Sequence, residues 1–309
     1  MPAPDVLHGV HERFAGADPA LPNGFAEHTP MGVDAMVALG LDASRVAAWA
    51  EHHRPQPLGP GEPIVAVRDA LRAELQTDDW EAVLRRHARV LLPAADAHLF
   101  HGLIRTAHAV RALGRRDDEA ARAELATGMA AWSVWADLPL ATGTPATTSA
   151  DTGRGLDAGG ADPAAATPSA SATAPPPGPL DAEAVVLDAE AVVLDAARRG
   201  AGAFVARPSI FTLHAVTAPM ALLQLWPVLD GDGHRAGADV IARTHAAHPP
   251  VAPETIGALD TRSLREDEVA RVADHWDAHP AKLVEACRRG YDHVADPVFL
   301  AAARQVAGG

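Results

Sequence analysis

The sequence predicts an all-α protein, organised as one large helical domain. Aromatic residues make up only 4% of the chain and alanine is abundant, a composition that favours helices over strands. Segments with helical patterns are bounded by capping residues, proline and glycine, and no segment has the alternating pattern of a strand. With 309 residues, of which 48% are apolar, the chain is long enough to bury a substantial core.

The N-terminal part contains a series of predicted helices. They are expected at residues 5–16, 30–39, 42–53, 65–75, 78–92, 95–114 and 117–137. Local chemistry sets their ends: Thr29 is a good N-cap, Pro30 suits the first helical position, and Gly40 ends the helix that they open. Asp42 caps the next helix, which ends before Pro55.

The C-terminal part continues the helical pattern. Helices are expected at residues 210–225 and 236–247, between 263 and 290, and at 297–305. Ser209 caps the first of these helices, which passes through Pro219. Residues 230–233 have the composition of a turn. Residues 263–266 form a capping-box sequence, which opens the helix expected to carry His275.

Residues 141–180 differ from the rest of the chain. They consist largely of Ala, Thr, Ser, Gly and Pro, and no aromatic residue occurs from 136 to 203. Such a segment cannot bury enough apolar surface to offset its ordering entropy, so we expect a disordered insert between residues 1–140 and 181–309 of the domain. It leads into two identical copies of a seven-residue sequence, 180–186 and 187–193, which suit a helix or a short coiled coil.

Charge and cysteine content narrow the class of protein. The net charge of −14 argues against nucleic acid or an anionic membrane surface as a partner. Cys287 is the only cysteine, so no internal disulfide forms and nothing requires an oxidising compartment. The N-terminus lacks the apolar region of a signal peptide, and no apolar run approaches the length of a membrane span. We therefore expect a cytoplasmic protein.

Lys282 is the only lysine in the chain, whereas the other 25 of the 26 basic residues are arginines. Lysine can lose its proton when buried, and arginine cannot, so Lys282 is a candidate for chemistry that arginine would not support. On one continuous helix, His275, His279 and Lys282 would share a face. Pro280 offers an alternative, because it disfavours helical geometry at His279 and favours a break there. A solvated lysine of no function is the other alternative.

Further histidines lie in patterns that suit a metal site. His98, His101, Arg105 and His108 form a polar stripe on the helix expected at 95–114, which would alternatively be a solvated face. His28 directly precedes a helix, and His214 lies in an apolar helix, where an imidazole needs a partner. A single histidine of this kind is usually a hydrogen-bonded core residue, but several on separate helices favour a shared Fe, Zn, Cu or Ni ion.

Other chemistries lack support in the sequence. It contains no Gly-x-Ser-x-Gly, no P-loop and no Gly-x-Gly-x-x-Gly motif. Cys287 has no surrounding signature of a cysteine enzyme. The chain therefore gives no indication of nucleotide binding by a standard motif.

Four short motifs, in this order, resemble the questin oxidase-like family. They are Gly24-Phe25-Ala26-Glu27-His28, His101-Gly102-Leu103-Ile104-Arg105, Phe211-Thr212-Leu213-His214-Ala215-Val216-Thr217 and His279-Pro280-Ala281-Lys282. The resemblance covers most of the chain outside the insert, and it implies a helical fold and oxidative opening of an anthraquinone-type ring. Three residues depart from the family pattern: Glu27 replaces the usual asparagine, Arg105 replaces a frequent second histidine, and Pro280 is unusual.

The resemblance also implies a set of site residues. They would hold a non-haem iron, Fe(II), through histidines and through a lysine carboxylated on its side-chain nitrogen. By motif position, the ligands would be His28, His101, His214, His279 and Lys282. His275 and His108 are substitutes for His279. Arg105 or His108 would orient a substrate phenolate, and His275 is a further candidate catalytic residue.

These observations predict an oxidoreductase, an iron-dependent oxygenase that uses O2 to oxidise an aromatic or quinone-type small molecule. Whether NADPH takes part stays open, because no motif for it is present. One alternative is a metal-dependent hydrolase, since a carboxylated lysine with histidines also holds metals that activate water. The other is a helical binding protein without catalysis. The sequence leaves the substrate and the oligomeric state open.

Overall fold

A computed structural model of the protein describes residues 3–21, 24–58, 62–140, 179–248 and 260–307, and of 179–187 only the backbone. Most of the predicted insert, 141–178, lies outside these ranges. Within them the structure is helical, and its only strand-like pairings are two isolated bridges. The prediction of an all-α fold is confirmed.

The N-terminal part folds into seven α-helices and two short 3-10 turns within its described ranges. Their bounds are α1 (Ala3–Phe14), α2 (Thr29–Ala38), α3 (Ala43–His52), α4 (Pro63–Thr77), α5 (Trp80–Leu91), η1 (Leu92–Ala94), η2 (Ala97–Phe100), α6 (His101–Arg115) and α7 (Glu119–Trp135).

The C-terminal part adds a second series of helices. Their bounds are α8 (Pro179–Ala206), α9 (Ile210–Leu225), η3 (Trp226–Val228), α10 (Gly231–His245), α12 (Glu266–Ala270), η4 (Arg271–Asp274), α13 (His279–Val294) and α14 (Pro297–Ala307). The seven-residue repeat is part of α8, as its period predicted.

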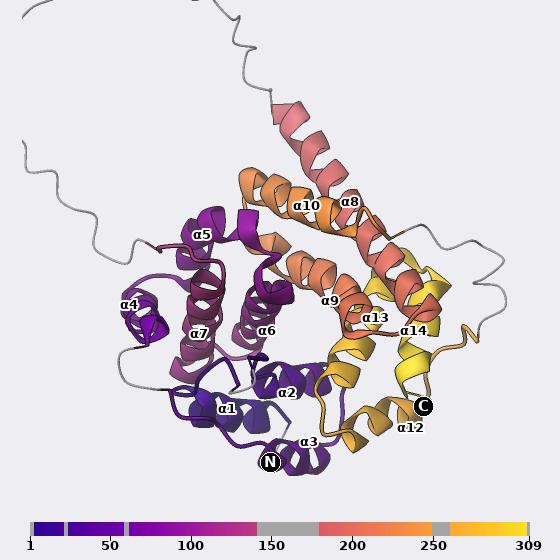
Figure 1. Cartoon of the computed structure of the whole chain (residues 1–309), viewed down its shortest axis with the longest axis horizontal. Coiled ribbons are helices and arrows are strands. Elements are labelled where there is room, and N and C mark those ends of the chain that lie inside the picture. Colours follow the sequence, from indigo (N-terminus) through magenta and orange to yellow (C-terminus); the bar gives the residue numbers. More distant parts are fainter. Residues whose placement is uncertain (1–2, 22–23, 59–61, 141–178, 249–259, 308–309) are drawn as a thin grey trace, which may run out of the picture.

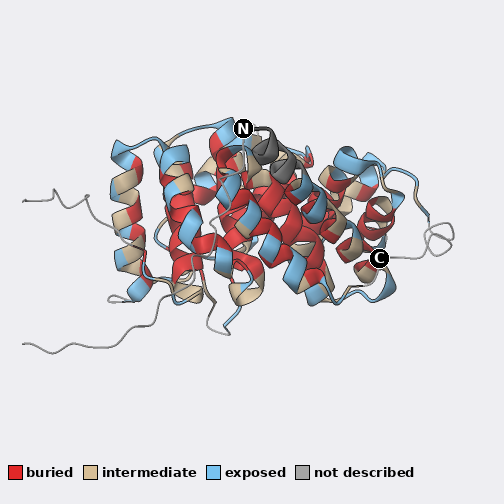
Figure 2. Ribbon diagram, turned by 90° about the horizontal axis from the view of Figure 1, so that it is seen from above, coloured by how far each residue is buried: buried red, intermediate tan, exposed pale blue. Residues whose placement is uncertain are grey.

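Four helices form the centre of the molecule. Helix α2 packs on α6, α6 on α9, α9 on α13, and α13 on α2, so the four close a ring (Figure 1). The remaining helices cover it: α1 and α3 pack on α2, α7 on α6, α8 and α10 on α9, and α14 on α13. Buried residues accordingly form a continuous band through the middle of the molecule (Figure 2). We call α2, α6, α9 and α13 the central ring.

Two glycines allow the covering helices to approach the ring closely. A Cβ on Gly200 of α8 would lie 2.1 Å from the carbonyl oxygen of Ala215 in α9. A Cβ on Gly102 of α6 would lie 2.4 Å from the Cβ of Trp132 in α7. Because Gly200 faces backbone that cannot move aside, α8 is held directly behind the residue that follows His214.

Several predicted helix ends are confirmed, and others are wrong. Asp42 caps α3 through the amide of Ser44, and Ser209 caps α9 in a reciprocal box with Thr212. Thr29 does not cap α2; its amide and hydroxyl both donate to the carboxylate of Glu27. The predicted turn at 230–233 is the first turn of α10, which Asp230 caps.

Two helices that the sequence predicted as continuous are interrupted. The helix expected at 95–114 starts only at His101, because residues 98–100 have left-handed backbone with φ of 49°, 56° and 64°. The helix expected to carry His275 ends early. Helix α12 and η4 stop at Asp274, residues 275–278 form a bend, and α13 begins at His279 with Pro280 in its first turn. His275 therefore shares no helix face with Lys282.

Helix α9 together with η3, Ile210–Val228, is long and apolar enough to cross a membrane by length and composition. This overturns the expectation that no apolar run reaches that length. However, 67% of its apolar window is buried inside the protein, as a core helix would be.

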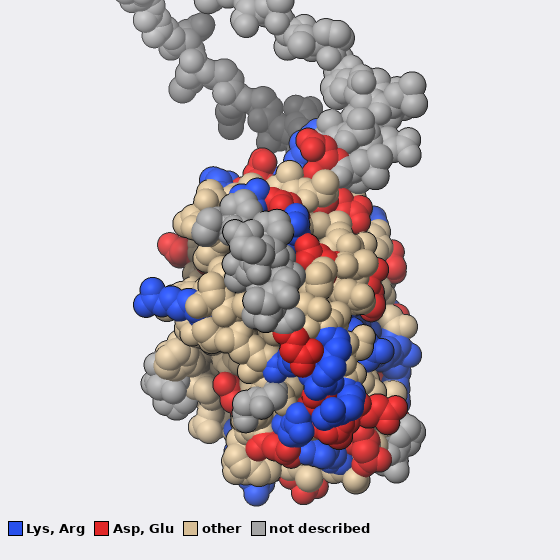
Figure 3. Space-filling view, turned by 90° about the vertical axis from the view of Figure 1, so that its right-hand side faces the viewer, with Lys and Arg blue, Asp and Glu red and all other residues tan. Residues whose placement is uncertain are grey.

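At the surface, basic and acidic groups are interleaved on the face drawn in Figure 3. One such pairing joins two helices, since Glu268 of α12 accepts hydrogen bonds from Arg304 of α14 and from Arg262.

Substituting Gly200→Ala should destabilise the protein by about 1–3 kcal/mol or more, because the new methyl group overlaps backbone atoms of α9. Gly114→Ala is the matched control, since Gly114 lies in α6 with no atom within 4 Å of its added Cβ. That change should leave stability unchanged or raise it by up to about 1 kcal/mol. Urea unfolding of both variants measures the difference. Equal stabilities would show that α8 does not depend on this close approach.

Candidate metal centre

Four histidines from the four helices of the central ring meet at one point. His28 immediately precedes α2, His101 and His279 are the first residues of α6 and α13, and His214 lies in the second turn of α9. The ring centroids of His28 lie 4.8 Å from His101 and 4.4 Å from His279, and those of His101 and His214 are 4.6 Å apart. His28 thus lies near His101, and His101 near His214, but the three histidines whose ligand atoms all lie within 4.8 Å of one another are His28, His101 and His279.

The Nδ1 atoms of three of these rings are tethered to oxygen acceptors. His101 donates to the carbonyl oxygen of His98, and His214 donates to that of Ile210 at 2.7 Å. His279 bonds through Nδ1 to the carboxylate of Asp277 at 2.6 Å. Since a carbonyl oxygen can only accept, Nδ1 carries the proton of a neutral ring, and Nε2 is left with a free lone pair.

The Nε2 atoms of His101 and His214 face each other at 3.2 Å. Both Nδ1 atoms act as donors, so in the neutral rings neither Nε2 carries a proton. The two Nε2 lone pairs therefore face each other, and no hydrogen bond can form between them. A metal bound at about 2.1 Å separates two ligand nitrogens by roughly 3.0 Å at a right angle and roughly 3.4 Å at the tetrahedral angle. The observed distance lies between these values.

The ligand atoms of His28, His101 and His279 all lie within 4.8 Å of one another. Two ligands on opposite sides of one metal are separated by roughly 4.2 Å, so a modest inward movement would bring the widest pair onto a common ion. Among the described residues, Nε2 of His28, Nε2 of His279 and Nζ of Lys282 are buried without a hydrogen-bond partner. Each such orphan costs about 1–3 kcal/mol, which a shared cation would recover.

Lys282 points into the core from the first turns of α13. Its side chain is 1% exposed, and burial lowers the pKa of the amine to about 7, although the charge of Asp277 opposes the shift. A large fraction of Lys282 is therefore the neutral amine at neutral pH. This is the form that binds a metal or reacts with CO2.

The same burial keeps the histidines neutral. Burial, followed by the charge of Lys282, lowers the pKa of His101 to about 2 and that of His214 to about 3. The pKa of His28 also falls well below its usual value for the same two reasons. Three of the helices begin at this point, and the partial positive charge of a helix N-terminus acts in the same direction. The centre thus offers neutral imidazoles and favours an anionic group beside them.

A strained turn holds His101 in place. His98, Leu99 and Phe100 all have left-handed backbone, which costs on the order of 1–3 kcal/mol for each non-glycine residue. The ring of His98 stacks on Trp135 at 4.4 Å and 15°, and Phe100 is buried. These contacts keep the carbonyl of His98 in reach of the His101 ring, so packing elsewhere offsets strain next to the site.

The structure places the three predicted catalytic residues outside the centre. Arg105 forms a buried pair with Glu124 through Nε and Nη2, with bonds of 2.7 and 3.0 Å, and its Nη1 has no hydrogen-bond partner among the described residues. His275 is exposed in the bend before α13, where its carbonyl accepts the indole proton of Trp49. His279 is therefore the histidine that lies beside Lys282.

His108 lies behind Lys282 instead of in front of it. It bonds to Asp34 at 2.7 Å, and Arg111 joins Asp34 to Glu285 in the same buried cluster. This cluster and Lys282 line a cavity of about 10 Å³, which is roughly the space of one water molecule. Sequence reasoning missed Asp34, whose partner is 74 positions away, and Asp277, whose spacing of two residues from His279 was a usable signal.

Substituting His101→Ala should remove most of the bound divalent metal, because it deletes the ligand that faces His214. His245→Ala is the control: His245 is equally buried, but its ring bonds the backbone of Ile241 and Ala215 and does not face the centre. We expect His245→Ala to lose stability and keep its metal. Elemental analysis measures the metal content of both variants after purification without an affinity metal. Full metal content in His101→Ala would show that His101 is not a ligand.

The metal-free protein should become more stable as pH rises from about 7 to 10.5. In this range the unfolded Lys282 holds a proton that the folded one has lost, so the unfolded state binds more protons and stability increases with pH. Below about pH 7 both states are protonated, and the full cost of the buried charge remains. Lys282→Met should abolish this pH dependence. Urea unfolding of both proteins in the presence of a chelator gives their free energies of unfolding at each pH, and the difference between the two curves is the contribution of Lys282. Parallel curves would contradict the buried amine.

Comparison of the chain with protein-family models, with characterised proteins and with solved structures finds no match. The candidate metal centre is therefore supported only by the residues of this chain, and the resemblance to the questin oxidase-like family remains a prediction.

Proposed function

We propose that the protein is a non-haem iron oxygenase, which uses O2 to oxidise or open an aromatic, quinone-type small molecule. Its Fe(II) ligands would be His28, His101, His214 and His279, with Lys282 carboxylated on Nζ. The observation that carries the proposal is the 3.2 Å approach of the two Nε2 lone pairs, beside three buried nitrogens that lack partners.

The donor set fits iron. Imidazole nitrogen suits Fe, Zn, Cu and Ni, and an oxygen donor from a modified lysine would add the single negative charge that the four neutral rings lack. When bound, iron would supply the one-electron chemistry that reactions of O2 require.

Lys282 would acquire its charge by reaction with CO2. The lone pair of the neutral amine forms a bond to the carbon of CO2, one proton leaves the nitrogen, and a carbamate with one negative charge results. Burial of Lys282 supplies the neutral amine, and the helix N-termini around it stabilise the anion that forms. The tethered Nδ1 atoms meanwhile keep the rings of His101, His214 and His279 in their orientations.

Exposed aromatic side chains support an aromatic substrate. Among the described residues, the exposed large aromatic side chains are Phe25, Phe211 and Trp276, at 59%, 64% and 53% exposure. Each stands three residues before a site histidine, at 28, 214 and 279 respectively. Two of those histidines, His28 and His279, are half-buried, so these aromatic side chains and the outer atoms of the two rings reach the surface. Trp276 already stacks on His52 at 3.9 Å, and planar rings stack favourably on an exposed face such as that of Phe211.

A metal-dependent hydrolase is the second candidate. It would use the same histidines and the same lysine, because this donor set also holds metals that activate water. Oxygen consumption separates the two. The assay offers a hydroxyanthraquinone and its reduced quinol to the iron-loaded protein, each with and without NADPH. Turnover without O2 uptake would favour the hydrolase, and a protein that binds no metal would be a binding protein.

Lys282→Arg should lose both its metal and its oxygen consumption, because arginine keeps a positive charge beside the rings and forms no carbamate. Lys282→Ala is the informative companion, since added propionate can replace the missing carboxylate in the space that it leaves. We expect propionate to restore metal binding to Lys282→Ala and not to Lys282→Arg. Carbon-13 NMR of the wild type with labelled CO2 should show a carbamate signal. A fully metal-loaded, active Lys282→Arg protein would refute the role of the lysine.

A further inference from the structure

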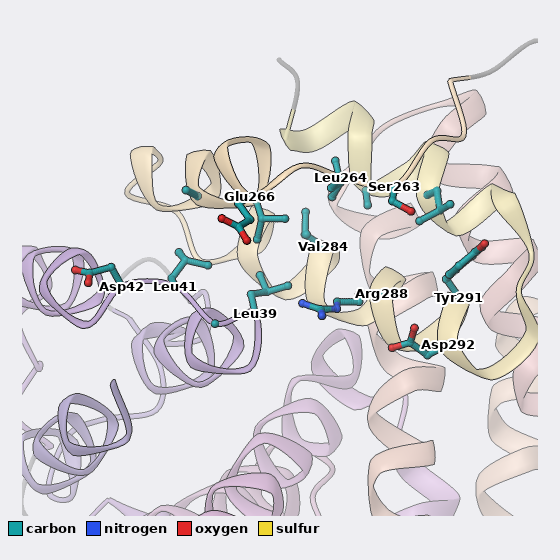
Figure 4. A pocket seen from close by; sticks show the side chains of 15 residues that line it. Leu39, Leu41, Asp42, Ser263, Leu264, Glu266, Val284, Arg288, Tyr291 and Asp292 are labelled. Atoms are coloured by element: carbon teal, nitrogen blue, oxygen red, sulfur yellow. The ribbon is translucent and has the colours of Figure 1, made fainter. Parts of the chain in front are cut away.

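A cavity of about 720 Å³ lies apart from the metal centre. Its walls come from the residues after α2, from the segment leading into α12, and from α12, α13 and α14 (Figure 4). Small-molecule sites in proteins usually measure about 300–1,000 Å³, so this cavity has the size of a ligand site.

Helix α13 separates the two sites. Lys282, Glu285 and Arg289 face the small cavity behind the metal centre, whereas Val284, Arg288 and Tyr291 line the large one. Helix α2 also separates the two sites, because they lie at its opposite ends. His28 precedes its first residue, the large cavity begins after its last, and ten helical residues span about 15 Å. A molecule in the large cavity would therefore not touch the histidines.

The floor of the cavity is apolar. Leu39, Leu41 and Val284 are buried beneath it, and Leu264 and Leu300 add half-buried apolar surface. Figure 4 shows Leu39 and Leu264 on opposite sides of the cavity, with Val284 between them. A ligand that fills this space would gain its affinity mainly from an apolar body.

Two polar groups on α13 face the cavity without a partner among the described residues. Arg288 makes no hydrogen bond or ion pair there, although its neighbour Arg289 bonds both Glu285 and the carbonyl of Met220. Tyr291, the only tyrosine of the chain, follows one helical turn later, and its hydroxyl also lacks a partner. Figure 4 shows the two side chains pointing away from each other, so the guanidinium of Arg288 is the donor suited to a carboxylate.

The remaining charges disfavour a ligand with more than one negative charge. Asp42, Glu266 and Asp292 also line the cavity, so a phosphate or a dicarboxylate would meet more repulsion than a single carboxylate beside Arg288. Figure 4 places Asp42 and Asp292 at opposite ends and Arg288 between them.

We propose that this cavity binds an apolar monocarboxylic acid, with the carboxylate at Arg288 and the apolar body along Leu39, Leu41 and Leu264. The site is separate from the metal centre, and the proposal does not depend on the function assigned there.

The test is calorimetric titration of the full chain with octanoate and with the neutral octan-1-ol. Octanoate should bind one-to-one, and roughly two- to fivefold more tightly than octanol, as expected for a charge pair with the exposed Arg288. Arg288→Gln should reduce octanoate affinity to that of octanol and leave octanol unchanged. Arg243→Gln, which removes an exposed arginine from α10, should change neither.

Two further variants fix the location. Ala270→Phe, which places an aromatic ring in the cavity, should weaken binding of both probes, and His101→Ala at the metal centre should leave both unchanged. The proposal is overturned by an absence of saturable binding, by equal affinity for octanoate in wild type and Arg288→Gln, or by loss of octanoate binding in His101→Ala.

Discussion

The structure depends on one electrostatic constraint: nitrogen atoms of four histidines and of Lys282 lie close together in the interior, and Nε2 of His28, Nε2 of His279 and Nζ of Lys282 have no hydrogen-bond partner among the described residues. The Nδ1 protons of His101 and His214 are donated to carbonyl oxygens, so two Nε2 lone pairs face each other at 3.2 Å. An arrangement of this kind is unfavourable without a cation. The packing of the central ring of helices keeps these nitrogens close together.

The rest of the fold explains how that shape is kept. The site histidines sit at or near the starts of their helices, so a small rotation of any helix would move its ring away from the centre. The outer helices restrict such rotation, most directly where Gly200 lets α8 lie against the backbone beside His214. Behind Lys282, the buried cluster around Asp34 and Glu285 joins α2, α6 and α13 through arginine. This polar cluster fixes the positions of α2, α6 and α13 relative to one another, whereas the other helix contacts of the core are mainly apolar.

Much of this could be predicted from the sequence, for identifiable reasons. Helix positions followed from capping residues, and His28, His214 and Lys282 were recognisable because each broke the local pattern of its segment. What failed was long-range or conformational. The partner of Arg105 is Glu124 on another helix, which no spacing rule indicates. The left-handed turn at 98–100 contains no glycine, so its composition did not predict it. Pro280, by contrast, did indicate the break that places His279 at the start of α13.

The two parts of the chain contribute unequally to the centre. His28 and His101 precede residue 141, whereas His214, His279 and Lys282 follow residue 178. A bound ion would therefore act as a non-covalent cross-link between the two parts, and its binding energy would add to their association.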